Sequence, residues 1–152
     1  MKYIFIAYLT LMSTFSFAQA NRVFTFDENV GLSDSLTLLY DNSLFQICNN
    51  DFNEAQDAWI NLLLEMEAYS DVINFDLKGI KLWIQLFWDE DGKIKYIGYQ
   101  LKPESRFVKN EDLKAFFSSF INNYHFPKVT KKKFNHSGNI TFPLVPVSLE
   151  RD

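Results

Sequence analysis

The chain has 152 residues and a formal net charge of −4 at pH 7, and 17% of its residues are aromatic, 16 of them Phe. This length is typical of one domain, and so many aromatic side chains can build a buried core without disulfides. The acidic balance excludes a protein that relies on a strongly basic surface, so we expect no nucleic acid partner. The only cysteine, Cys48, cannot form an intramolecular disulfide and is expected to be a small buried side chain, with a reactive thiol or an intermolecular bridge as the alternative.

Residues 1–20 have the pattern of a secretory signal peptide. Lys2 supplies a positive charge, an apolar run extends to Met12, and small residues precede two possible cleavage points, after Ala18 or after Ala20. The apolar run is shorter than the roughly 20 residues of a membrane-spanning helix, which disfavours an uncleaved anchor. We therefore expect a secreted or periplasmic protein with no stable membrane span after cleavage.

Residues 21–50 are expected to form an N-terminal lead-in to the domain. Residues 21–32 show no helical period, and residues 33–40 could form a short helix, with Leu36, Leu39 and Tyr40 on one side. The folded domain is expected over residues 51–144.

The first long helix is predicted to begin at Asp51. Asp51 can cap the first turn while Glu54, three residues later, reaches back as in a capping box. The apolar residues that follow recur every three or four positions, which is typical of a helix that packs on a sheet: Ala55, Ala58, Trp59, Leu62, Leu63, Met66 and Tyr69.

Residues 79–101 are predicted to form a β-hairpin, the element on which the rest of the fold depends. Apolar residues alternate along its first arm, with one set on one face (Leu82, Ile84, Leu86 and Trp88) and Trp83 and Phe87 on the other. The turn is predicted over residues 89–92, where Gly92 tolerates the positive φ that a short hairpin loop needs.

A second helix is predicted over residues 111–124, capped by Asn110 and ended by Pro127. Its apolar stripe is the strongest helical pattern in the chain: Leu113, Phe116, Phe117, Phe120, Ile121 and Tyr124. Residues 134–144 are predicted to form a last strand, and residues 145–152 a loose tail. The predicted fold is α+β, a small antiparallel sheet of the hairpin plus the C-terminal strand, packed against two amphipathic helices.

Residues 78–144 contain a series of short motifs in a characteristic order. They are a glycine before the first strand, a D-x-D-G-(R/K)-(V/I) turn, a serine in the next loop, a helix, and an aromatic-proline pair before the last strand. In this sequence these are Gly79, Asp89-Glu90-Asp91-Gly92-Lys93-Ile94, Ser105, the helix from Asn110, and Phe126-Pro127. In their order and spacing, these motifs resemble the C-terminal domain of TonB-type proteins.

This resemblance implies a periplasmic protein-binding fold, in which an exposed sheet edge accepts an extended partner segment by strand addition. The partner would be another envelope protein or an extended peptide, and the binding residues would lie on the last strand: Phe134, Asn139, Ile140, Thr141 and Phe142. The chain has only 4 prolines and no long proline-rich spacer. We therefore do not expect it to transmit force from the inner membrane.

No pattern in the sequence points to catalysis, and we expect no enzyme, cofactor or metal. The only histidines, His125 and His136, do not have metal-ligand spacing such as H-E-x-x-H, and no G-x-S-x-G motif is present. The run from Asp89 to Gly92 begins like a calcium loop, but its glycine stands at position four instead of six.

An alternative function is a small apolar-ligand carrier or a hydrolase with an aromatic pocket. Four aromatic residues could line such a pocket between the sheet and the helices: Trp59, Trp83, Trp88 and Tyr99. The competing interpretation is that these rings belong to the core.

Overall fold

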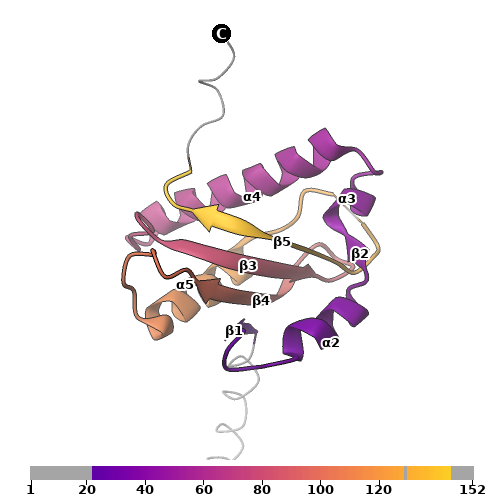
Figure 1. Cartoon of the computed structure of the whole chain (residues 1–152). Coiled ribbons are helices and arrows are strands. Elements are labelled where there is room, and N and C mark those ends of the chain that lie inside the picture. Colours follow the sequence, from indigo (N-terminus) through magenta and orange to yellow (C-terminus); the bar gives the residue numbers. More distant parts are fainter. Residues whose placement is uncertain (1–21, 129, 145–152) are drawn as a thin grey trace, which may run out of the picture.

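The computed structural model describes residues 22–128 and 130–144 as five strands and four helices (Figure 1). The expected signal peptide, residues 1–20, and the expected tail, residues 145–152, lie outside the described residues. The elements follow in the order β1 (Val23–Thr25), α2 (Leu32–Leu39), β2 (Asn42–Ser43), α3 (Leu44–Ile47), α4 (Phe52–Val72), β3 (Lys81–Trp88), β4 (Ile94–Leu101), α5 (Asn110–Asn123) and β5 (Phe134–Thr141).

The five strands form one mixed sheet in the order β1-β4-β3-β5-β2. The predicted α+β class is confirmed, but the prediction of a purely antiparallel sheet is wrong. Only the three central strands are antiparallel, whereas β1 pairs with β4 and β2 pairs with β5 in parallel. The segment expected as a lead-in therefore supplies both outer strands of the sheet.

The hairpin of β3 and β4 forms as predicted. Gly92 has a φ of 79°, its N–H donates to the carbonyl of Asp89 (3.0 Å), and the N–H of Asp89 donates to the carbonyl of Lys93 (2.9 Å). Leu82, Ile84, Leu86 and Trp88 are all at most 1% exposed, as expected of residues on one buried face of the sheet.

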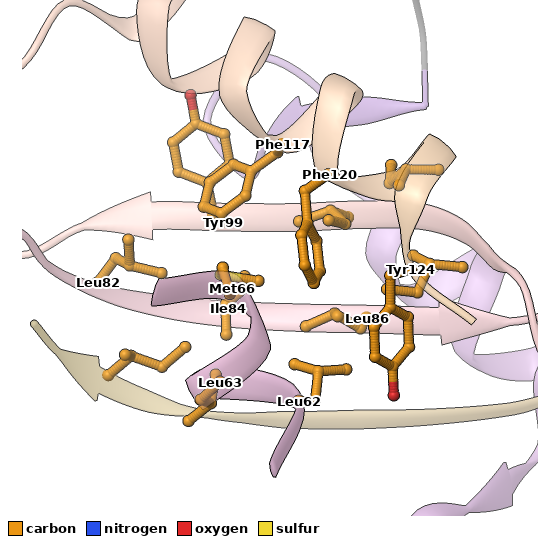
Figure 2. Close-up of a cluster of buried hydrophobic side chains, with 14 of the residues drawn as sticks. Leu62, Leu63, Met66, Leu82, Ile84, Leu86, Tyr99, Phe117, Phe120 and Tyr124 are labelled. Atoms are coloured by element: carbon orange, nitrogen blue, oxygen red, sulfur yellow. The ribbon is translucent and has the colours of Figure 1, made fainter. Parts of the chain in front are cut away.

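Helices α4 and α5 cover this face together (Figure 2). Leu62, Leu63 and Met66 of α4 meet Phe117 and Phe120 of α5 above the side chains of β3, and all of these residues are at most 5% exposed. At about 1.5–3 kcal/mol for each fully buried large apolar side chain, this layer is the main source of stability of the fold. The predicted packing of two amphipathic helices on the sheet is confirmed.

The opposite face of the sheet is covered by α2 at one end. Leu36 and Tyr40 pack there with Phe24 of β1 and Phe87 of β3. Leu39, which was expected on the same side as Leu36 and Tyr40, is instead 65% exposed.

The helix starts differ from the predictions in two details. Asp51 caps α4 by accepting a hydrogen bond from the N–H of Glu54 (3.1 Å), but the side chain of Glu54 forms an ion pair with Lys128. Helix α5 begins at Asn110, so Asn110 is its first residue and not its cap, which is Lys109.

Cys48 is buried at 0% exposure, as expected of a small apolar side chain, and burial raises the pKa of its thiol. Within residues 22–128 and 130–144, no helix has the length and apolar character needed to cross a membrane.

Candidate functional site

The outer edge of β5 is the candidate site that the sequence analysis places on the last strand. On one side, β5 pairs with β3 along its whole length, from Phe134 to Thr141. On the other side, β2 pairs only with Phe134 and Asn135. Beyond these two residues, β5 has no strand partner on its outer side within the described part of the chain.

The direction of the backbone groups on β5 follows from one hydrogen bond at its end. The N–H of Phe142 donates to the carbonyl of Ile80 (3.0 Å), so residues at even positions point their backbone groups toward β3. Because the backbone groups of successive residues point to opposite sides of a strand, the N–H and C=O groups of Ser137, Asn139 and Thr141 point outward. We call these three residues and their backbone groups the free edge.

The free edge lacks the features that usually prevent strand pairing. Edge strands in proteins are commonly protected by lysine, by other charges or by proline. Strand β5, with the sequence FNHSGNIT, contains none of these residues. Its outer edge is therefore chemically open to another extended segment.

The structure separates the five predicted binding residues into two groups. Phe134, Ile140 and Phe142 are buried, at 0%, 2% and 1% exposure, and belong to the core beneath α4 and α5. Asn139 and Thr141 are exposed on the opposite face. Of the five, only Asn139 and Thr141 combine an exposed side chain with outward backbone groups.

Ser137 belongs to the free edge but is absent from the predicted binding residues. The period of two along β5 was the signal that could have identified it, because every second residue from Asn135 onward shares one orientation. The prediction took neighbouring residues instead.

Helix α4 covers the core-facing side of β5 beside the free edge. The indole of Trp59 packs against the ring of His136 and lies 3.4 Å from the position that a Cβ atom would take on Gly138. Burial lowers the pKa of His136, so the neutral imidazole is the favoured form here.

The four aromatic residues of the alternative pocket do not come together. Trp88 stacks on Phe134 (ring centroids 4.7 Å apart) and is 1% exposed, and Tyr99 packs on Phe117 and is 0% exposed. Trp59 lies over β5, whereas Trp83 is on the other face of the sheet and is 38% exposed. Trp88 and Tyr99 are core residues.

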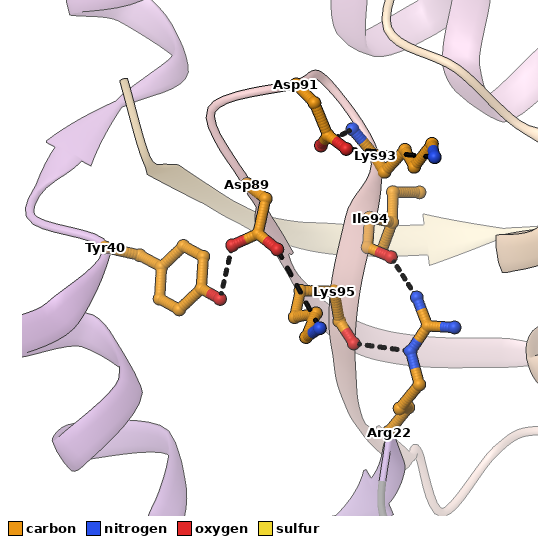
Figure 3. Close-up of polar contacts among 7 residues, drawn as sticks. All are labelled: Arg22, Tyr40, Asp89, Asp91, Lys93, Ile94 and Lys95. Atoms are coloured by element: carbon orange, nitrogen blue, oxygen red, sulfur yellow. Dashed lines mark hydrogen bonds and ion pairs between the residues drawn. The ribbon is translucent and has the colours of Figure 1, made fainter. Parts of the chain in front are cut away.

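The acidic hairpin turn holds neighbouring segments together (Figure 3). The hydroxyl of Tyr40 donates to Asp89 (2.9 Å), and the ammonium of Lys95 lies 4.0 Å from the same carboxylate. Arg22, just before β1, donates to the carbonyl oxygens of Lys95 (3.0 Å) and Ile94 (2.6 Å). Desolvation, followed by the bond to Asp89, raises the pKa of Tyr40, which keeps the hydroxyl protonated as the donor.

In the described ranges, no group of three or more His, Cys, Asp or Glu side chains is arranged to hold a metal ion. A surface hollow of about 320 Å³ lies away from β5 and is lined in part by Phe75, Arg106 and Phe107.

Comparisons with known proteins identify no relative of this chain. No family model matches the chain, and neither the curated proteins nor the solved structures contain a match to it.

Proposed function

We propose that this protein is a secreted or periplasmic, non-enzymatic binding module that takes an extended segment of another envelope protein onto the free edge. The observation that carries the proposal is an edge that has no strand partner among residues 22–128 and 130–144, on a strand without charge or proline. Strand addition needs outward backbone donors and acceptors, and Ser137, Asn139 and Thr141 supply them in a row.

A TonB C-terminal-like fold for residues 78–144 is part of this proposal. The hairpin of β3 and β4, helix α5 and strand β5 follow in the order that the resemblance implies, and β5 pairs beside β3. The parallel strands β1 and β2 come from outside the resembling segment. They add to both edges of its three-stranded sheet, and on the outer side of β5 strand β2 pairs only with Phe134 and Asn135.

The proposal is tested with peptides selected for binding to the purified protein from a library of short random sequences. We expect bound peptides to slow hydrogen exchange at the amides of Ser137, Asn139 and Thr141, because each would gain a backbone hydrogen bond. Asn139→Pro removes one outward N–H group and should weaken binding about tenfold or more.

Glu90→Pro is the matched control for the introduction of a proline. Glu90 is exposed at the second position of the hairpin turn, where proline is favoured, so this variant should keep full affinity. Peptides that bind the Asn139→Pro variant as tightly as the unmodified protein would contradict the proposal, as would a selection that recovers no binder.

A further inference from the structure

Half of the sheet face opposite α4 and α5 is left uncovered by the helices that the structure describes. Gln85 marks its boundary, because it accepts a hydrogen bond from Ser33 (2.5 Å) and donates one to Thr37 (3.1 Å), both on α2. Beyond Gln85, alternate residues of the three central strands, together with the residue that follows β4, form a surface that we call the open face: Lys81, Trp83, Gln100, Lys102, Asn139 and Thr141.

Trp83 lies at the centre of the open face. Its register partners are Gln100 on β4 and Asn139 on β5, both exposed, so an amide side chain stands on each side of the indole. The Trp83 side chain is 38% exposed. A rigid aromatic ring held at the surface between two amides is a combination that proteins use for binding, because it offers a large contact area at low entropic cost.

The charge of the open face is positive, although the chain as a whole has a net charge of −4. The N–H of Lys102 donates to the carbonyl of Lys81 (2.9 Å), which brings the two lysines next to each other at one end of the face. Among the described residues neither lysine takes part in an ion pair. No residue of the open face is acidic.

We propose that the open face binds an acidic saccharide chain. The Trp83 indole stacks on the C–H face of a sugar ring, and the amides of Gln100 and Asn139 hydrogen-bond its hydroxyl groups. Lys81 and Lys102 pair with the carboxylates of uronic acid units. The charge of the face selects an acidic chain over a neutral one.

Other occupants fit the open face less well. A small molecule needs a concave pocket that buries most of its surface, whereas the open face is one side of a sheet. A second copy of this chain, docked face to face, would place two positively charged faces against each other, which like-charge repulsion opposes. This inference does not depend on strand addition, because it uses side chains on the face and not the backbone of the free edge.

The experiment is titration of the purified protein with polygalacturonate, with neutral dextran in parallel, followed by calorimetry. We expect polygalacturonate to bind with an affinity that falls as salt is added, and dextran to show no binding. Trp83→Ala should weaken binding about tenfold or more. The double variant Lys81→Gln/Lys102→Gln should also bind more weakly and lose most of the salt dependence.

Phe107→Ala is the matched control, because Phe107 is an aromatic residue that is 82% exposed and lies outside the open face. It should keep full affinity. Thermal unfolding verifies that each variant is folded, and if Trp83→Ala is not, Gln100→Ala and the double lysine variant provide the test, with the same expected loss. The proposal is overturned if polygalacturonate does not bind, if dextran binds equally well, or if the folded variants bind as tightly as the unmodified protein.

Discussion

The indole of Trp59 meets the imidazole of His136 nearly edge to face, with the ring centroids 4.6 Å apart. This contact joins α4 to β5 directly behind the free edge. The stability of β5 should therefore depend on the protonation state of a single, partly buried imidazole.

The first prediction concerns the pH dependence that follows from this burial. Because burial lowers the pKa of His136 below its ordinary value of 6.5, the unfolded chain takes up this proton at a higher pH than the folded chain. The contribution of His136 to stability is complete above pH 6.5 and is lost as the pH falls from 6.5 through the folded-state pKa. Urea unfolding at a series of pH values measures the effect.

His136→Phe keeps a ring against Trp59 but removes the titration, so it should flatten the pH dependence over this range. His125→Gln, at an exposed position, serves as the control and should leave the decline intact. An equal decline in the His136→Phe variant would show that other groups cause it.

The second prediction compares two glycines of the same sheet. A Cβ atom on Gly98 would lie 2.7 Å from the ring of Phe26 and 2.8 Å from that of Phe24, and Phe24 is only 2% exposed. Gly98→Ala should therefore lower the free energy of unfolding by about 1–3 kcal/mol, the usual effect of overpacking. A Cβ atom on Gly138 would lie 3.4 Å from Trp59, so Gly138→Ala should lower the free energy of unfolding by clearly less. Equal losses in urea unfolding would contradict this explanation.

The third prediction concerns the buried amide that links α2 to the sheet. Gln85 is 9% exposed and donates to Thr37 and to Asn135 (3.3 Å), whose own side chain donates to the carbonyl of Tyr40 (2.7 Å). Gln85→Leu would remove the three side-chain hydrogen bonds that this buried amide makes with Ser33, Thr37 and Asn135, at a cost of about 1–3 kcal/mol. Chemical denaturation measures this loss, and Gln100→Leu, at an exposed position of the next strand, should change stability by less than about 0.5 kcal/mol.

The sequence correctly predicts those elements that are specified by residues close together in the chain. The alternation along β3 and the turn ending at Gly92 depend on local backbone geometry, and the structure confirms both. Strands β1 and β2 have three and two residues, too few to display a period of two. They are stabilised by pairing with β4 and β5, far along the chain, and no local pattern reports such pairing.

The helix caps show the same limit. Asp51 caps α4 through a backbone group three residues away, which the sequence predicts. The partner of Glu54 is Lys128, which only the folded chain brings near. Ser43, the N-cap of α3, forms a complete capping box with Gln46. This is a local motif that the prediction overlooked.

The resemblance predicted a candidate site on the last strand, but it did not predict which side chains of that strand face solvent. Neighbouring residues Ile140 and Thr141 were grouped together, whereas the strand directs one into the core and the other to solvent. The open face could not be predicted at all, because the register of three strands places Trp83 between Gln100 and Asn139.

The two parallel outer strands also determine the order in which the sheet can be assembled. Val23 pairs with Ile97, and Asn42 pairs with Phe134, so each outer strand pairs with a strand that follows it by more than 70 residues. Contacts between such distant residues slow folding. Strand β1 can pair once β4 has been synthesised, whereas β2 can pair only after β5, the last strand of the sheet, has been synthesised and has joined β3.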